Sequence, residues 1–134
     1  LYGTNHKFYG WMDYFYVGNG HNNVGLVDLR LQTKFKTGEK SALQARAHYF
    51  MSEVKVVNAA DPARDYSNGL GFEVDLVMSW KPHEAVGIDL GYSQMFATES
   101  MEVLKGGDKD EHNSWTWVMI TFKPKLFSYT KEIE

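Results

Sequence analysis

Charged and polar side chains recur at every second position along several runs of this sequence, and they are the residues that could do chemistry. The candidate set contains both signs of charge and consists of Asp28, Arg30, Lys34, Arg46, His48, Glu73, Asp75 and Asp89. Residues two apart on an extended strand project from the same face. The spacing therefore predicts one polar surface shared by several strands, rather than a compact catalytic pocket.

Six alternating runs would position these side chains. Strict apolar–polar alternation over this length is a strand signal and fits no helical period. The runs span residues 7–17, 26–36, 41–51, 70–81, 86–93 and 114–124. We predict an all-β fold, an antiparallel up-and-down meander of six strands without a helix. The opposite, apolar face is predicted to contain Val27, Leu29, Leu31, Val74, Leu76, Ile88 and Leu90.

The connections between these runs alternate in length. Residues 37–40 and 82–84 form tight turns, whereas residues 18–23, 52–68 and 98–113 form long polar loops. Short turns at one end and long loops at the other are typical of outer-membrane β-barrels, with the short turns in the periplasm. The loop lengths therefore predict strands that belong to a transmembrane β-barrel.

Strand length and aromatic placement agree with this prediction. The alternating runs approach the roughly 9–11 residues of a tilted membrane strand, whereas globular strands average about five or six. Aromatic side chains gather near the strand ends, among them Trp80, Trp115 and Trp117. Because such rings favour the headgroup level of a bilayer, we expect these tryptophans at the membrane interfaces.

Composition excludes several classes of protein. The 134 residues contain 14 Lys and Arg against 17 Asp and Glu, a formal net charge of −3, so we predict no nucleic-acid partner. Cysteine is absent, which excludes disulfides, cysteine-based zinc sites and thiol nucleophiles. Aromatic residues make up 15% of the chain, while the mean hydropathy is −0.42. That combination is typical of alternating strands in a barrel.

Three segments resemble the alginate-export family of outer-membrane porin-like barrels. They are residues 3–15 (GTNHKFYGWMDYF), residues 70–76 (LGFEVDL) and residues 118–127 (VMITFKPKLF). The resemblance implies that residues 1–127 are C-terminal strands of an outer-membrane barrel and residues 128–134 a periplasmic tail. It also implies a bacterial outer-membrane location and non-catalytic passage or export of anionic solutes or polysaccharide.

The expected partners follow from this environment. A barrel wall contacts the lipid bilayer and lipopolysaccharide outside, and anionic small solutes or polysaccharide inside. Six strands cannot close a transmembrane barrel, since the smallest have about eight. An open sheet in lipid would leave unpaired backbone groups at both edges. We therefore expect the remaining strands of the same barrel as a further partner; assembly from several copies of the chain is the alternative.

The candidate set is then expected to line the pore, with two alternative consequences. Basic side chains at Arg30, Lys34, Arg46 and His48 would favour anionic solutes. Alternatively, basic and acidic rows on neighbouring strands pair across the sheet and keep the lumen polar. Counting from the tight turns puts Arg46 at the height of Glu73 or Asp75, and we predict an ion pair between them.

Catalysis, cofactors and metals are not predicted. His48 with Glu73 or Asp75 imitates part of a catalytic constellation, but no nucleophile-elbow or H-E-x-x-H motif is present. Acidic residues and a histidine cluster after Gly106 and Gly107, at Asp108, Asp110, Glu111 and His112. Their spacing does not match a calcium-binding EF-hand loop. We therefore expect no enzyme activity, no cofactor and no metal site.

A soluble barrel that binds an apolar ligand, as lipocalins do, is the alternative function. Such a barrel would enclose the apolar faces and turn the charged faces toward water, the reverse of a membrane barrel. Alternation alone does not show which face of the strands is turned toward water, so the sequence leaves both arrangements open.

Overall fold

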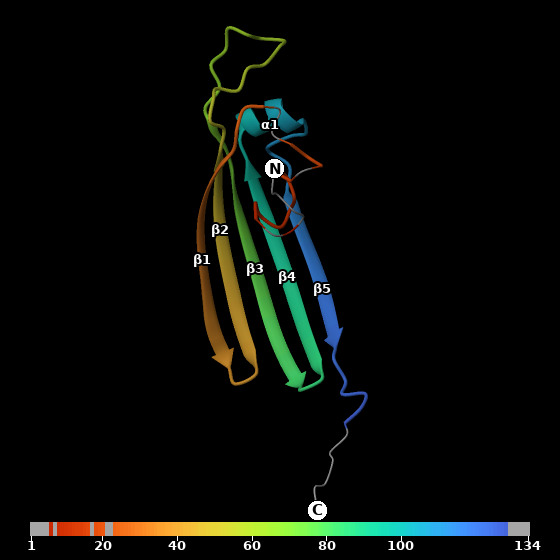
Figure 1. The fold of residues 1–134 in the computed structure, drawn as a ribbon. Coiled ribbons are helices and arrows are strands. Elements are labelled where there is room, and N and C mark those ends of the chain that lie inside the picture. The colour runs from red at the N-terminus through yellow and green to blue at the C-terminus, as the bar shows by residue number, and fades with distance from the viewer. Residues whose placement is uncertain (1–5, 7, 17, 21–22, 129–134) are drawn as a thin grey trace, which may run out of the picture.

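The chain forms one open antiparallel sheet (Figure 1). The structure is a computed structural model that describes residues 6, 8–16, 18–20 and 23–128. Within this part of the chain the sheet has five strands, each hydrogen-bonded to its sequence neighbours in the order β1-β2-β3-β4-β5. They are β1 (Val27–Gly38), β2 (Ser41–Met51), β3 (Gly69–His83), β4 (Val86–Ala97) and β5 (Asn113–Phe122). The predicted all-β meander is confirmed.

Strand boundaries follow the alternation closely. β2 has the predicted bounds. β4 extends further toward the long loops than the prediction, and β3 is longer at both ends, reaching from Gly69 to His83. The pairing has no slip across the middle of the sheet: Leu31, Ala47 and Val74 lie opposite one another on three successive strands. Because a slip of one residue would exchange the two faces, this register keeps the predicted apolar set on one side.

Turns and loops separate to opposite ends of the sheet, as predicted (Figure 1). The β1–β2 and β3–β4 connections are tight turns at one end. Residues 52–68 and 98–112 lie at the other end, which we call the loop end. Successive antiparallel strands must reverse at alternate ends, so this separation follows directly from the alternating loop lengths.

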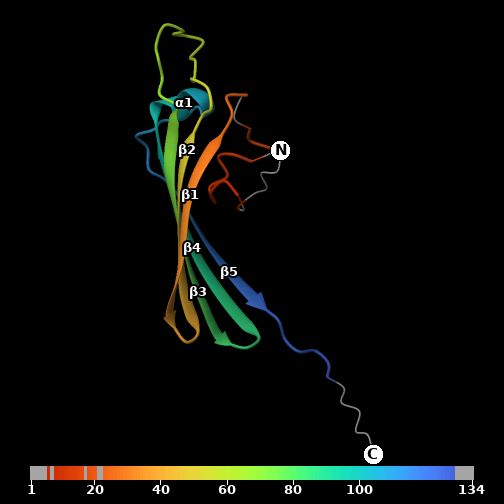
Figure 2. The ribbon, with the colours of Figure 1, turned by 60° about the vertical axis from the view of Figure 1, so that its left-hand side comes forward.

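The prediction of a first strand over residues 7–17 is wrong for the part that the structure describes. Residues 8–16 run through a series of bends, with one isolated bridge between Tyr16 and Asn19; Lys7 and Val17 lie outside the described residues. Gly10 (φ +80°) and Asp13 (φ +56°) have left-handed backbone conformations that interrupt an extended strand. The segment instead lies beside one face of the sheet (Figure 2).

The prediction that no helix occurs is also wrong. Helix α1 (Glu99–Lys105) lies within the expected loop 98–113. The Thr98 side chain accepts a hydrogen bond from the Met101 amide as the N-cap, and Gly106 ends the helix with φ +77°. Acidic residues in the first turn and Lys105 in the last complement the helix dipole.

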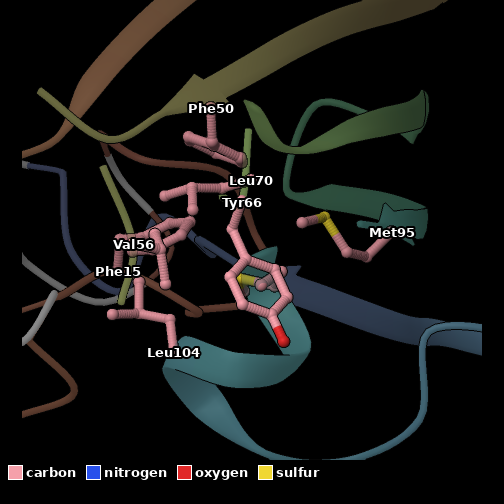
Figure 3. Close-up of a cluster of buried hydrophobic side chains, with 8 residues drawn as sticks. Phe15, Phe50, Val56, Tyr66, Leu70, Met95 and Leu104 are labelled. Carbon is pink, nitrogen blue, oxygen red and sulfur yellow. The ribbon is translucent and has the colours of Figure 1, made fainter. Parts of the chain in front are cut away.

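The hydrophobic core lies at the loop end, between the sheet, α1 and residues 8–16 (Figure 3). It brings together side chains from distant parts of the chain: Phe15, Phe50, Val56, Tyr66, Leu70, Met95, Met101 and Leu104. Phe15 and Phe50 rings contact at a centroid distance of 4.9 Å. This cluster fixes the long loops and the helix against the end of the sheet.

Beyond β5, residues 123–128 continue without regular secondary structure. The predicted boundary after Phe127 falls in this stretch, and residues 129–134 of the predicted tail lie outside the described residues. Among the helices of the described residues, none has the length and apolar character needed to cross a membrane.

Candidate pore-lining surface

The eight candidate residues share one face of the sheet, which we call the polar face. The register places Arg46 opposite Asp75 and His48 opposite Glu73, while Ser79 lies opposite Asp89. The pairing of β1 with β2 brings in the remaining members, Asp28, Arg30 and Lys34. The sheet therefore gathers the predicted set on one surface, with the predicted apolar set on the other.

A segment formed by residues 8–16 covers the loop-end half of the polar face (Figure 2); we call it the N-terminal segment. Its contact with the sheet centres on Glu73, which is 0% exposed. One carboxylate oxygen, Oε1, accepts hydrogen bonds from the backbone amides of Trp11 at 2.6 Å and Met12 at 3.0 Å. These two hydrogen bonds attach the N-terminal segment to a polar group that is buried in the sheet.

Gly10 makes this close approach possible. A Cβ atom at position 10 would overlap the Glu73 carboxylate, and the backbone has φ +80°. Only glycine adopts such a conformation without strain. The buried position of the Glu73 carboxylate therefore requires glycine at position 10.

Stacked aromatic rings hold the N-terminal segment at a second point. Trp11 stacks on Trp117 of β5 with centroids 4.9 Å apart, and His6 stacks on Trp115 at 4.8 Å. Trp117 in turn lies against Gly91, where a Cβ would overlap the indole. Trp115 and Trp117 are therefore on the polar face, which corrects their expected place at a membrane interface; Trp80 is on the apolar face and half exposed.

His48 lies between two carboxylates in the buried part of the polar face. Its Nδ1 is 2.9 Å from Asp28 Oδ1, and its Nε2 is 3.8 Å from Asp75 Oδ2. Both His48 and Asp75 are 1% exposed. Three polar atoms here have no hydrogen-bond partner among the described residues: His48 Nε2, Glu73 Oε2 and Asp75 Oδ2. The sheet thus concentrates acidic groups that the chain covers with its own residues.

Arg46 has the predicted neighbour but not the predicted ion pair. It lies directly opposite Asp75, yet within the described part of the chain no carboxylate is within 4 Å of its guanidinium. Asp75 Oδ1 instead accepts from the Ser93 hydroxyl at 2.6 Å. The Arg46 guanidinium lies 5.2 Å from the centroid of the Trp11 ring, a cation–π distance.

Of the other candidate residues, Lys34 and Asp89 lie nearer the tight turns, whereas Arg30 lies opposite His48 toward the loop end. Arg30 and Lys34 are exposed, and Asp89 accepts a hydrogen bond from the Ser79 hydroxyl at 2.5 Å. A pocket of about 480 Å³ is lined by Asp28, Arg30, Phe8 and Tyr9. A solute in this pocket would meet a guanidinium beside two aromatic rings.

Tyr14 connects the N-terminal segment to the start of β5, where its hydroxyl accepts a hydrogen bond from the Asn113 side chain. Burial raises the pKa of Tyr14, and the charge of Glu73 raises it further. The neutral phenol is therefore the form that the folded chain favours.

The long loops carry separate contacts. Lys105 of α1 donates to the Asn19 backbone and side-chain oxygens at 3.1 and 2.9 Å. Arg64 pairs with Glu99 at 2.7 Å, and this hydrogen bond raises the pKa of Arg64. Among the described residues, no three His, Asp or Glu side chains are close enough to hold a metal ion, including those near Asp108.

Sequence reasoning misses the N-terminal segment as part of this surface. Alternation assigns Tyr9 and Trp11 to a strand, although aromatic side chains occupy both faces of that run. Gly10 between two aromatic residues is the signal that could indicate a bend. Its buried partner, Glu73, is 62 residues from Trp11 and has no local signature.

The buried polar groups do not have the geometry of a catalytic triad. In a Ser-His-Asp arrangement the histidine accepts the serine proton, whereas here Ser93 donates to Asp75 rather than to His48.

No family model matches the chain, and neither the search of curated proteins nor that of solved structures finds a similar protein.

Proposed function

We propose that this sheet is part of the wall of an outer-membrane β-barrel, a porin-like channel that passes anionic solutes or polysaccharide without catalysis. The supporting observation is the polarity of the two faces. The loop-end half of the polar face is covered by the chain's own N-terminal segment, whereas apolar side chains of the opposite face remain exposed, as with Leu31 at 74% and Phe122 at 70%. A lipocalin-like barrel would bury that apolar face around its ligand.

Aromatic side chains border the apolar face at both ends and support a membrane environment. Tyr49, Phe72 and Phe96 lie opposite one another on β2, β3 and β4 near the loop end. Trp80 lies eight residues beyond Phe72 along β3, a strand length of about 26 Å. With a tilt of about 40° Trp80 lies about 20 Å from this row along the membrane normal, comparable to the apolar band of about 25 Å in outer-membrane barrels.

The open edges of the sheet require further strands. β1 and β5 each pair on one side only within the described chain. Unpaired backbone groups cost several kcal/mol each in a hydrocarbon environment. Five strands do not reach the about eight of the smallest barrels. The proposal therefore includes additional strands of the same barrel as partners of β1 and β5, with bilayer lipid and lipopolysaccharide against the apolar face.

The preference for anions rests on which charges remain accessible. The exposed charged side chains of the polar face are basic: Arg30, Lys34, Lys36 and Lys81. The carboxylates of Asp28, Glu73, Asp75 and Asp89 each have a partner on the sheet or in the N-terminal segment. Solutes in the lumen would therefore meet mainly basic side chains at the surface of this face, which favours anions. The resemblance of three segments to the alginate-export family points to the same class of solute.

Planar-bilayer recordings test the proposal, using the full-length protein with any strands that flank these 134 residues. We expect ion conductance and a reversal potential of anion-selective sign under a salt gradient. Arg30→Gln combined with Lys34→Gln should reduce that preference, whereas the matched loop variant Lys109→Gln should not. A protein that stays monomeric in water without detergent and binds an apolar ligand would support the lipocalin-like alternative instead.

A further inference from the structure

We propose that the N-terminal segment is the constriction of this channel, and that it sets the charge preference by covering the acidic part of the wall. This inference rests on the proposed function and adds to it the element that determines solute size and charge. The segment lies on the polar face, the side that would face the lumen (Figure 2). A layer of chain packed on a sheet is about 10 Å thick, enough to narrow the lumen of a barrel substantially.

The attachment of the segment to the wall is specific. Glu73 binds two successive backbone amides, those of Trp11 and Met12, and Trp11 stacks on Trp117 from a different strand. Phe15 anchors the far end of the segment, being 3% exposed in the hydrophobic core. Three points of contact on β3, β5 and the core hold the segment across the sheet rather than along one strand.

The covered groups are the acidic ones. Glu73 and Asp75 are at most 1% exposed, as is the neighbouring His48, while the basic Arg30 and Lys34 of β1 are exposed. Release of the segment would present the Glu73 and Asp75 carboxylates to the lumen, together with His48, Asp28 and Arg46 beside them. The wall would then gain negative charge, so its preference for anions should fall.

Gly10 offers a substitution that releases the segment without changing the charge of the wall. In Gly10→Ala the new Cβ would collide with the Glu73 carboxylate, and the backbone would be strained at φ +80°. Gly20→Ala is the matched control, because a Cβ at position 20 has no atom within 4 Å. Both variants add one methyl group to the same part of the full-length protein.

Two measurements are made on each variant. Acrylamide quenching of tryptophan emission reports release, because Trp11 and Trp117 have buried indole nitrogens. Bilayer recordings report conductance and reversal potential. For Gly10→Ala we expect stronger quenching, a conductance higher by about twofold as the layer of about 10 Å leaves the lumen, and a shift of the reversal potential toward cations. Gly20→Ala should match the wild type in all three.

Glu73→Gln added to Gly10→Ala separates the effect on charge from that on size. The double variant should keep the raised conductance of Gly10→Ala but recover part of its lost anion preference, since one uncovered carboxylate is removed. A merely structural role for Glu73 would leave the reversal potential of the two variants equal. That equality would contradict the proposed source of selectivity.

A disulfide lock provides a second route if Gly10→Ala assembles poorly. A Cβ at position 10 lies 2.5 Å from Glu73 Cδ. Since Cδ is about 2.5 Å from the Cβ of its own side chain, the Cβ atoms of residues 10 and 73 are at most about 5 Å apart. In a disulfide the two Cβ atoms are about 3.5–4.5 Å apart. In Gly10→Cys with Glu73→Cys, conductance should be low when oxidised and rise on reduction. The chain has no other cysteine.

The outcomes distinguish this inference from the proposed function. A wild-type protein that conducts no ions overturns the channel itself. A conducting protein whose conductance and selectivity stay unchanged in Gly10→Ala, or through reduction of the disulfide, overturns the constriction alone. Stronger quenching with unchanged conductance also overturns it, because the segment would then leave the wall without widening the path.

Discussion

A charge introduced at the centre of the apolar face gives the sharpest test of the membrane environment. Leu76 lies midway along β3 between Phe72 and Trp80, four residues from each, and is 38% exposed. Four residues span about 13 Å of strand, or about 10 Å along the normal after a tilt of about 40°. An arginine side chain reaches about 6 Å when it extends toward an interface, so a guanidinium introduced at this position would remain in hydrocarbon.

Leu76→Arg should therefore lower the free energy of unfolding by an amount in the upper part of the range for charges at the midplane of outer-membrane barrels, which is about 2–4 kcal/mol. Reversible unfolding of the full-length protein in lipid vesicles measures this free energy. Val86→Arg is the matched control: Val86 is an aliphatic residue of the same face next to the β3–β4 turn, where the cost should fall to about 0–1 kcal/mol. Exposed surface substitutions in water usually change stability by only about 0.5 kcal/mol. A cost this small for Leu76→Arg in vesicles would refute the assignment of this face to lipid.

Three further variants test individual contacts. Arg46→Ala removes a guanidinium opposite Asp75, so the reversal potential should move toward cations; an unchanged anion preference would count against a lumen-facing Arg46. Thr98→Ala removes the N-cap of α1 and should lower helix stability by about 1 kcal/mol, seen as faster amide exchange in residues 101–105, with exchange in β2 unaffected. The raised pKa of Tyr14 means that its stabilising contribution is complete below the ordinary tyrosine pKa and is lost as pH rises through the raised value. Tryptophan quenching should therefore increase as pH rises above the ordinary tyrosine pKa of about 10, and less so in Tyr14→Phe; equal increases in both proteins would exclude Tyr14 as the cause.

The sheet could be predicted from sequence because the signals that specify its strands and turns lie close together in the chain. Side chains alternate with a period of two, and the tight turns fix the register of each hairpin. The bounds of β2 follow from the alternation, and counting from the two tight turns puts Arg46 at the height of Glu73 or Asp75, of which the structure places Asp75 opposite it. The ion pair could not be predicted in the same way, because Ser93 and Trp11 compete for the two partners and come from other parts of the chain.

Residues 8–16 and α1 show two different reasons for a wrong prediction. The N-terminal segment alternates in sequence, and only the distant carboxylate of Glu73 and the conformation of Gly10 draw it away from an extended strand. Helix α1 does have local signals: Thr98 as a cap, Gly106 as a stop, and Met101 and Leu104 three residues apart as a buried face. Its seven residues are fewer than a periodicity search detects.

The meander also dictates an order of assembly. Every strand pairs with its sequence neighbours, so each hairpin can form from contacts close in the chain, which is the fast part of folding. Docking of the N-terminal segment is different, because Trp11 meets Glu73 across 62 residues and Tyr14 meets Asn113 across 99. Although ribosomes make this segment before any of the five strands, its binding surface exists only after β5 has joined the sheet. The N-terminal segment is therefore synthesised before the sheet and reaches its native place after it.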